Sequence, residues 1–260
     1  VRHLSQFYNY ALQNYKVMEL VEPTYEDVEN QIKNFDILFC APNHQTFVID
    51  EDLIKDSNVK SILSPSTGLN HIDVDSVPIV SVKNDKILNN VWSTAEHALY
   101  LMLSIVRGKH ELHEKTLGII GYGRLGKMVE QLCKPLFQDV ICVDEDDDMS
   151  LLYIESDVVS IHIDLNPTTK NLIDNEFLSH FKRNIYLINT ARGEVVNEKD
   201  IKHLLSVGRI KGYATDVLQS EYNGKQSTFD GVENVITTPH IAGTSIEAQE
   251  KAYQRVLEKI

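Results

Sequence analysis

The chain has 260 residues, of which 42% are hydrophobic and 24% charged, and its formal net charge at pH 7 is −13. This composition is typical of a soluble globular protein with room for two modest domains, and the acidic balance argues against nucleic acid or an anionic membrane surface as the main partner. No apolar run reaches membrane-spanning length, no signal peptide is recognisable and the three cysteines lack C-x-x-C spacing, so we expect a cytoplasmic protein.

The first ninety residues alternate helical and strand-like patterns, which predicts a small α/β unit. Helices are expected over 2–14 and from Thr24 to Asn34, with Thr24 as the cap. The expected strands are 17–20, 36–40, 59–63 and 79–82. Because α/β folds bind ligands in loops at strand ends, the loop 64–68 is a candidate ligand-binding segment.

A long helix is expected over 93–106. Ser93 and Glu96 are spaced as a capping box, and apolar side chains cover nearly all faces, so the helix must be buried as a domain connector or at a subunit interface. His110 and His113 follow among glutamates in a pattern that resembles metal ligands. No third cluster completes such a site, so we expect a solvated linker and no metal.

The stretch 116–126 carries the most specific pattern in the chain. An apolar run predicts a buried strand, which breaks at Gly121-Tyr-Gly123-Arg-Leu-Gly126 before apolar residues recur at helical spacing. In such a unit the first glycine permits a tight turn, the second lets the backbone approach a pyrophosphate, and the third lets the helix pack on the strand. The helix N-terminus offers N–H groups and a positive dipole end to phosphates. The pattern therefore predicts a dinucleotide site.

The next strand, 140–143, ends in Asp144, at the distance expected for an acid that accepts hydrogen bonds from an adenosine ribose. Asp144 opens an acidic run that extends to Asp148, and no arginine stands beside it. A ribose 2′-phosphate would meet several negative charges there, so NAD is favoured over NADP.

The α/β alternation continues to the end of the chain, where Thr244 and Glu247 are spaced as a capping box for a last helix. The strands expected after the acidic run are 157–163, 185–188, 211–217 and 235–238. Together with the two strands around the glycine loop they predict a doubly wound parallel sheet, so the fold class is α/β with a Rossmann domain and a smaller α/β domain.

Two connections, 107–112 and 144–156, are short for such a fold, and the second leaves room for only one short helix. Either they are reduced in this protein or residues are missing from the sequence. The sequence also opens at Val1 rather than at a methionine, which leaves a preceding segment open.

Three polar side chains stand at or just beyond the carboxyl ends of consecutive strands: Arg192, Glu221 and His240. Alone, each has a simpler explanation, as a surface arginine, a loop acid or a satisfied core histidine. Together they form a unit, because strand ends near the glycine loop are where a nicotinamide and a substrate would meet. An arginine fork holds a carboxylate in two parallel bonds, and a histidine beside a carboxylate gives or takes a proton near neutral pH. This set suits hydride transfer at the carbon next to a carboxylate.

From about Ser64 to Gln249 the chain resembles the D-isomer-specific 2-hydroxyacid dehydrogenases, the family of D-lactate, D-glycerate and D-3-phosphoglycerate dehydrogenases. The motifs that carry the resemblance are Ser66-Thr-Gly-Leu-Asn-His-Ile-Asp73, Ser93-Thr-Ala-Glu-His97, the glycine loop with Asp144, Ser156-Asp-Val-Val-Ser-Ile-His162, Asn189-Thr-Ala-Arg-Gly193, Asp216 with Glu221, and Thr238-Pro-His-Ile-Ala-Gly243. The resemblance implies an NAD-dependent oxidoreductase that interconverts a small D-2-hydroxy acid and its 2-oxo acid.

The resemblance also implies roles for single residues. Arg192 would bind the substrate carboxylate and the reacting oxygen, His240 would donate the proton in the reduction direction, and Glu221 would be its partner. The implied substrate-binding residues are Asn43, Thr67 and Gly68. The implied cofactor-binding residues are Gly121, Gly123, Arg124, Leu125, Gly126, Asp144, Thr190, Ala191, Asp216, Gly243, Thr94 and His162.

For the whole chain, the resemblance implies a flavodoxin-like substrate-binding domain over 1–90 and an NAD-binding Rossmann domain over 91–245. The last helix, 246–260, would return to the substrate domain. A cleft between the domains and a homodimer built on the cofactor domain are also implied.

Two departures from the family bear on the substrate. Tyr222 follows Glu221 where the family often has proline, and the loop 41–44 lacks the arginine that members often carry there. The missing arginine argues against a phosphorylated substrate. A function of another class stays open, because some relatives act as NAD(H)-sensing scaffolds or corepressor-like binding proteins with little turnover.

Overall fold

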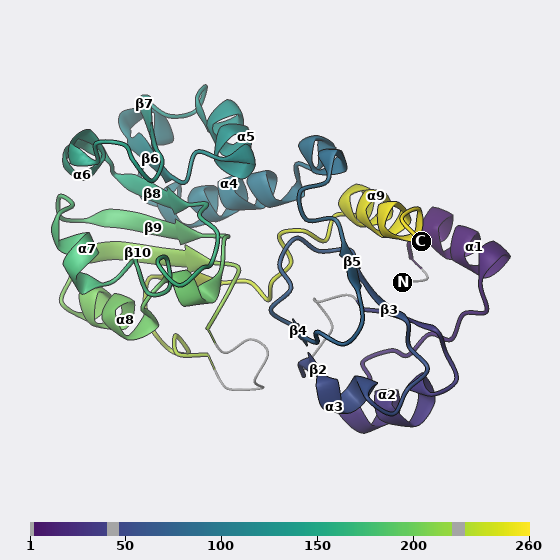
Figure 1. Ribbon diagram of the computed structural model, residues 1–260. Coiled ribbons are helices and arrows are strands. Elements are labelled where there is room, and N and C mark those ends of the chain that lie inside the picture. Colours follow the sequence, from purple (N-terminus) through teal and green to yellow (C-terminus); the bar gives the residue numbers. More distant parts are fainter. Residues whose placement is uncertain (1–2, 41–46, 220–226) are drawn as a thin grey trace. The chain divides into compact units, whose positions relative to one another are not determined.

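Residues 3–40, 47–219 and 227–260 are described by the computed structural model. They divide into two units (Figure 1): the first comprises the residues up to Val91 together with Gly243–Ile260, and the second runs from Trp92 to Ala242. Both units are α/β structures with parallel sheets, which confirms the predicted fold class. Within the described residues, no helix is both long enough and apolar enough to cross a membrane.

The first unit is built on a parallel sheet in the order β1-β3-β5 and a parallel pair, β2-β4. Its strands are β1 (Ile37–Phe39), β2 (Ile49–Asp50), β3 (Ser61–Ser64), β4 (Ile72–Asp73) and β5 (Ile79–Ser81). Its helices are α1 (Ser5–Asn14), α2 (Tyr25–Ile32), α3 (Glu51–Ile54), the 3-10 turn η2 (Lys86–Asn90) and α9 (Ile246–Leu257). Thr24 caps α2, as predicted, through a reciprocal pair of bonds with Asp27.

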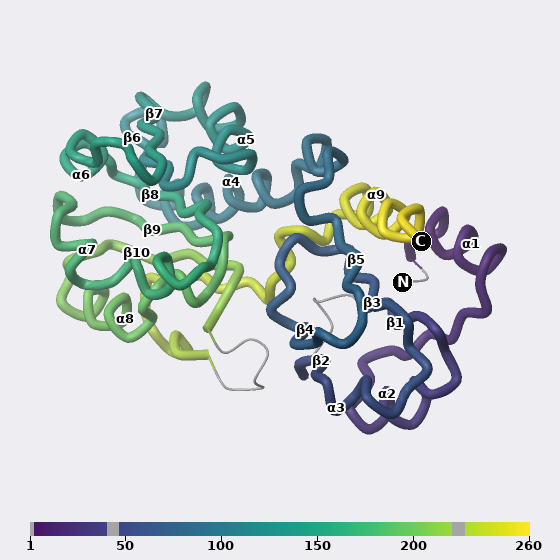
Figure 2. Tube along the Cα trace, in the orientation of Figure 1, coloured from purple at the N-terminus to yellow at the C-terminus, as the bar shows by residue number. Residues whose placement is uncertain are grey.

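The last helix, α9, packs into the core of the first unit. Tyr253 and Val256 of α9 share an apolar cluster with Phe7 of α1 and Phe39 of β1. The three rings of this cluster lie 5.2 to 5.3 Å apart between centroids, a separation at which aromatic pairs attract. Figure 2 shows α1 and α9 side by side. Segments far apart in sequence therefore close the same core.

An ion cluster fastens α9 to the loop before η2. The Asp85 carboxylate, 8% exposed, lies 2.9 Å from both Arg255 Nε and Lys259 Nζ, and it accepts the N–H of Ile87 at 3.0 Å. That backbone bond and the two cations hold the pKa of Asp85 well below its usual range. The stabilisation is therefore complete above the ordinary aspartate pKa of about 3.9 and is lost as the pH falls below it.

Replacing Asp85 by asparagine is expected to lower the Tm at neutral pH by roughly 2–4 °C, because the amide keeps the acceptor for Ile87 but loses the charge. Below about pH 4 the difference from wild type should shrink, since protonation of this carboxylate in the unfolded chain then competes with the folded ion cluster. Thermal melts across that range check this, with Asp52→Asn, from an exposed pair with Lys55, as the control. A difference that stays constant in acid would contradict the assignment.

The second unit holds, within the described residues, a six-stranded parallel sheet in the order β11-β10-β9-β8-β6-β7. The strands are β6 (Thr116–Ile120), β7 (Asp139–Val143), β8 (Val158–Ile161), β9 (Ile185–Asn189), β10 (Ile210–Thr215) and β11 (Val235–Thr237). Their central members are nearly continuous apolar runs because helices cover both faces. The doubly wound sheet predicted from the sequence is confirmed.

The helices of this unit form two layers (Figure 1). On one face, α4 (Ser93–Val106) and α5 (Arg124–Cys133) share a core with Leu117 and Ile119 of β6. On the other, α6 (Ser150–Glu155), α7 (Asn175–Ser179) and α8 (Glu198–Ser206) pack around Leu187 of β9. Two 3-10 turns, η3 (Leu112–Glu114) and η4 (Gly193–Val195), lie in the connections.

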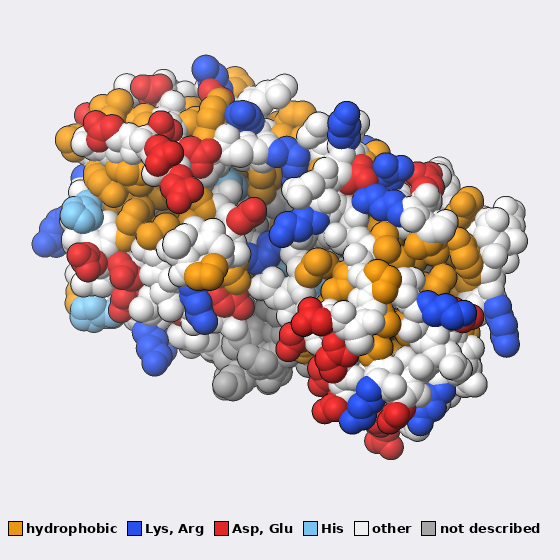
Figure 3. Space-filling view, in the orientation of Figure 1, with side chains coloured by type: hydrophobic (Ala, Val, Ile, Leu, Met, Phe, Trp, Pro, Cys, Tyr) orange, Lys and Arg blue, Asp and Glu red, His pale blue; other side chains and the backbone are white. Residues whose placement is uncertain are grey.

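The sheet ends on β7, at the side where a Rossmann sheet usually continues with a third strand. The chain returns from β7 to β8 through the acidic loop and α6 alone. Leu151 and Ile154 of α6 are 58% and 64% exposed, and hydrophobic side chains gather on the surface around this helix in Figure 3. The short connection thus leaves a sheet edge and a helix face open among the described residues.

One prediction about secondary structure is wrong. Residues 17–20 form no strand; Val17 and Met18 are 38% and 50% exposed, so a strand-like pattern without a partner stays irregular. In the single chain, Tyr100 and Leu103 of helix α4 are 53% and 39% exposed, so the predicted burial of this face at a subunit interface stays a prediction.

Both predicted capping boxes after residue 90 are also wrong. Helix α4 has Trp92 at its cap position, and the Ser93 hydroxyl donates instead to the carbonyl of Ala242 at 2.6 Å. Helix α9 begins one residue later than expected, because Ser245 rather than Thr244 accepts the N–H of the third helical residue. In the first case a tertiary acceptor outcompetes the local one.

Candidate functional site

The site residues predicted for the second unit collect at one edge of its sheet. The strands are parallel, so their carboxyl ends share that edge. The glycine loop follows β6, Asp144 follows β7, His162 follows β8, 190–192 follow β9, Asp216 follows β10, and His240 follows β11. The strand order reverses between β6 and β8, which is where open α/β sheets bind ligands.

The glycine loop has the geometry that each glycine was predicted to provide. Gly121 has φ of +92°, and a Cβ there would lie 2.7 Å from the carbonyl of His162. A Cβ on Gly126 would lie 2.2 Å from the Gly121 oxygen, so α5 packs directly on the turn. Gly123 faces open space and caps α5 without a side-chain bond, which leaves the first-turn N–H groups for a ligand. The loop is therefore a cradle that fits a pyrophosphate.

Two alanine variants should separate the roles of these glycines. Gly126→Ala is expected to lower the Tm, because its Cβ collides with backbone that cannot move aside. Gly123→Ala is expected to fold with an unchanged Tm yet to weaken NADH binding about tenfold or more, because the methyl group occupies the approach of the pyrophosphate.

Thermal melts and NADH fluorescence titrations check both results, with Gly108→Ala as the control, since Gly108 also faces open space but lies outside the loop. Equal NADH affinity in Gly123→Ala and wild type would argue against the cradle.

Two buried polar atoms at the same edge have no hydrogen-bond partner among the described residues: Nδ1 of His162 and Oγ1 of Thr190. They follow adjacent strands, since Ile161 pairs with Asn189. His162 Nε2 lies 2.9 Å from Ser160 Oγ, and burial lowers the pKa of His162 to about 3, so the ring is neutral. Buried polar groups are normally satisfied, so these atoms fit the presence of a polar ligand.

Asp144 is exposed at the end of β7 and begins a turn of acids. Its N–H donates to the Asp147 carboxylate at 2.8 Å, and its own carboxylate accepts the N–H of Glu145 at 3.2 Å. These bonds hold the acidic run as an ordered loop beside the glycine cradle, where a sugar hydroxyl could be accepted and a further phosphate would be repelled.

The loop after β9 presents Arg192. Asn189, fully buried, accepts the N–H of Ala191 at 3.0 Å and donates to the carbonyl of Arg192 at 2.9 Å, which fixes a tight turn. The half-buried Arg192 side chain donates from Nη1 to the carbonyl of Ala191 at 2.5 Å. Gly193 packs against the backbone of Leu218, where a Cβ would come within 2.2 Å. Asn189 was not predicted as a site residue; the signal was an asparagine directly at a strand end.

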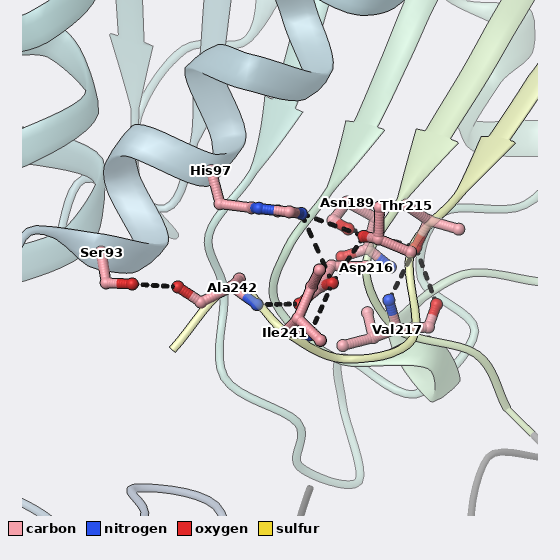
Figure 4. Close-up of polar contacts among 9 residues, drawn as sticks. Ser93, His97, Asn189, Thr215, Asp216, Val217, Ile241 and Ala242 are labelled. Carbon is pink, nitrogen blue, oxygen red and sulfur yellow. Dashed lines mark hydrogen bonds and ion pairs between the residues drawn. The ribbon is translucent and has the colours of Figure 1, made fainter. Parts of the chain in front are cut away.

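The loop after β11 is organised by Asp216, which is 1% exposed (Figure 4). One carboxylate oxygen accepts from the Thr238 hydroxyl at 2.5 Å and the N–H of Ile241 at 2.9 Å, and the other accepts the N–H of Ala242 at 2.8 Å. His240, half-buried, has φ of +53° and donates its N–H to the carbonyl of Asp216 at 2.9 Å. Asp216 was predicted to contact the cofactor, and the structure shows that it anchors the loop that carries His240.

The other predicted residues are distributed as follows. Thr94 lies in the first turn of α4, and Arg124 and Leu125 open α5. Gly243, Thr67 and Gly68 belong to the first unit. Glu221 and Asn43 lie outside the described residues.

The loop with Thr67 and Gly68 follows β3 and is held by a series of side-chain hydrogen bonds. Ser66 Oγ donates to the carbonyl of Gly68 at 2.7 Å and lies 2.8 Å from Ser64 Oγ. Ser64 Oγ in turn lies 3.0 Å from Nε2 of His71, which is 1% exposed. Thr67 itself is exposed. The hydrogen bonds make this loop an ordered turn at the end of β3.

The carboxyl ends of the strands in the second unit thus carry three features together. These are a loop that fits a phosphate group, a guanidinium on a fixed turn, and a histidine on an anchored loop. A guanidinium can bind a carboxylate in two parallel bonds. An imidazole can transfer a proton near neutral pH. No group of three His, Cys, Asp or Glu side chains suited to a metal occurs among the described residues.

Residues 88–242 match the family model described as D-isomer specific 2-hydroxyacid dehydrogenase, NAD binding domain. Among curated proteins, the chain is 27% identical over 270 residues to the formate dehydrogenase of Candida boidinii, covering 86% of this chain and 74% of that protein. It is 29% identical to the D-3-phosphoglycerate dehydrogenase of Methanocaldococcus jannaschii over 91% of this chain and 51% of that protein.

Solved structures resemble the chain in fold. The NAD-dependent formate dehydrogenase of Staphylococcus aureus in complex with NAD superposes with a TM-score of 0.82 at 24% identity, covering 99% of this chain and 88% of that one. The D-lactate dehydrogenase of Aquifex aeolicus complexed with NAD and lactic acid gives a TM-score of 0.76 at 24% identity, covering 99% and 91%.

Proposed function

The chain belongs to the D-isomer-specific 2-hydroxyacid dehydrogenase family and carries its NAD-binding domain, and from this premise we propose that it interconverts a small D-2-hydroxy acid and its 2-oxo acid. The observation that carries the proposal is the position of Arg192 and His240. They follow β9 and β11, on either side of β10, at the sheet edge that holds the glycine cradle.

In this proposal Arg192 binds the substrate carboxylate with its guanidinium fork, which its bond to the Ala191 carbonyl keeps in one orientation. His240 gives a proton to the carbonyl oxygen during reduction and takes it from the hydroxyl during oxidation, with Glu221 as its partner. Bound NAD supplies or accepts the hydride at the substrate carbon. The glycine cradle, Thr190 and His162 hold the dinucleotide, and Asp144 accepts hydrogen bonds from its ribose.

The formate dehydrogenases among the relatives give a second candidate reaction, the NAD-dependent oxidation of formate. Formate has no hydroxyl group, so its conversion to carbon dioxide is a hydride transfer that needs no proton donor or acceptor. A 2-hydroxy acid has a hydroxyl proton that must be transferred, and His240 can transfer it. The presence of His240 therefore favours the 2-oxo acid reaction over formate oxidation. The relatives reported above are dehydrogenases, so an NAD(H)-sensing scaffold is not favoured.

NADH oxidation against a panel of 2-oxo acids tests the proposal: glyoxylate, pyruvate, hydroxypyruvate, longer apolar acids and phosphorylated ones, with formate and NAD as a separate arm. We expect rapid turnover of one unphosphorylated acid and its loss in a His240 variant. Turnover of formate alone would replace the proposal by the second candidate. NADH binding without any turnover would return attention to partner proteins.

Two further features are part of the proposal. A homodimer built on the second unit is supported by exposed apolar side chains on α4, Tyr100 and Leu103. Light scattering on the purified protein tests this. A cytoplasmic location is proposed from the sequence alone and is tested by cell fractionation.

A further inference from the structure

The first turns of α4 contact the loop that carries His240 at two points. Ser93 Oγ donates to the carbonyl of Ala242 at 2.6 Å, and Nε2 of His97 lies 2.9 Å from Thr238 Oγ1 and 3.4 Å from a carboxylate oxygen of Asp216. Figure 4 shows both side chains extending from the helix towards this loop. Ser93 and His97 are four residues apart, so they lie on one face of the helix.

The direction of the hydrogen bonds defines the role of His97. The Thr238 hydroxyl proton is directed at Asp216, so the Thr238 oxygen accepts from His97, and His97 carries a proton on Nε2. The chain of bonds therefore runs from α4 through Thr238 to Asp216. Asp216 also accepts hydrogen bonds from the N–H groups of Ile241 and Ala242, so one buried carboxylate binds residues along the whole loop.

The loop between these contacts is in a conformation that needs such support. His240 has φ of +53°, in the left-handed region that residues with a side chain rarely adopt. A residue held there persists only when its surroundings fix it, and here contacts stand on both sides: Thr238 before it and Ala242 after it. Helix α4 therefore contacts the His240 loop on both sides of His240, although no atom of α4 belongs to the proposed proton-transfer pair.

We propose that Ser93 and His97 are positioning residues that, through Thr238, Asp216 and Ala242, hold the His240 loop in its productive conformation. The inference rests on the proposed function, because it assigns His240 the proton transfer. It gives the Ser93-Thr-Ala-Glu-His97 motif a task in the reaction in place of the helix cap that the sequence suggested.

The test uses the full-length protein and four variants. His97→Leu removes the donor, and His97→Gln restores one, because the glutamine amide nitrogen reaches nearly as far as imidazole Nε2. Ser93→Ala removes the second contact. Ser104→Ala is the matched control: it deletes a hydroxyl on the same helix that donates to a backbone carbonyl, that of Tyr100, away from the loop.

Two measurements are made on each variant: steady-state kinetics with NADH and the best 2-oxo acid, and amide hydrogen exchange of the peptide 238–242. For His97→Leu we expect kcat to fall about tenfold or more while the Kd for NADH stays within about twofold. Exchange at Ile241 and Ala242 should rise about tenfold, with β9 unchanged. His97→Gln should recover most of the kcat and most of the protection from exchange. Ser93→Ala should lower kcat and speed exchange by smaller factors than His97→Leu, and Ser104→Ala should match wild type in both.

The proposal is overturned if His97→Leu keeps its kcat, or if its kcat falls without faster exchange in 238–242. Loss of NADH affinity in parallel with kcat would also overturn it, since His97 would then serve the cofactor. If wild type turns over no 2-oxo acid, the proposed function fails by itself, and the exchange measurement still decides whether α4 holds the loop.

Discussion

Replacing His240 by asparagine is expected to lower kcat for 2-oxo acid reduction by about 10²- to 10⁴-fold, the usual loss when a general acid is removed. Asparagine is the informative replacement because it tolerates the left-handed backbone better than most residues, and His240 has φ of +53°. The loop should therefore keep its shape while the proton donor is lost. NADH affinity should stay close to wild type, since the glycine cradle is untouched.

Single-turnover kinetics and NADH titration measure the two effects separately. His203→Asn provides the matched control, because His203 is an exposed histidine on α8, away from the strand ends. If His240→Asn retained wild-type kcat, another group would have to supply the proton, and the assignment of His240 would be withdrawn.

Exchanging Arg192 for lysine is expected to lower kcat/KM for the 2-oxo acid by about 10²-fold, mainly through a higher KM. Lysine keeps the positive charge but replaces a planar fork by a point charge, so one of the two parallel bonds to the carboxylate is lost. The loss corresponds to one charge-assisted hydrogen bond. The Tm should change little, because Asn189 rather than the Arg192 side chain fixes the turn.

Arg209→Lys gives the opposite pattern and serves as the comparison. The Arg209 guanidinium donates to the backbone carbonyls of Leu178, Phe181 and Lys182, so its replacement should lower the Tm and leave KM unchanged. An Arg192→Lys enzyme with an unaltered KM would place the substrate carboxylate at another cation.

The sequence predicted those parts of the molecule that follow from local pattern. The strand, turn and helix around Gly121 are adjacent in the chain, and the spacing of the three glycines is itself the geometry of the loop. Parallel strands then bring their carboxyl ends to one edge, so the grouping of 190–192, Asp216 and His240 followed from the fold class.

What escaped prediction depends on partners distant in sequence. Ser93 has the spacing of a helix cap, but its hydroxyl finds an acceptor 149 residues away, at Ala242. His97 stands in an apolar helix, where a histidine is usually a satisfied core residue, and only the folded chain shows that its partners belong to the His240 loop. Residues 17–20 failed for the converse reason, because an apolar pattern forms a strand only where a neighbouring strand exists.

The early end of the second sheet gives the acidic run a further consequence, for contacts between copies of the protein. Strand β7 is an edge strand, and an open edge is a template on which a second copy can add its own β7 in antiparallel orientation. Such pairing would bring Asp139, at the start of one strand, beside Asp144 at the end of the other. Two carboxylates at such a short distance repel each other. The acids at both ends of β7 therefore disfavour pairing of this edge strand with a second copy, which opposes aggregation.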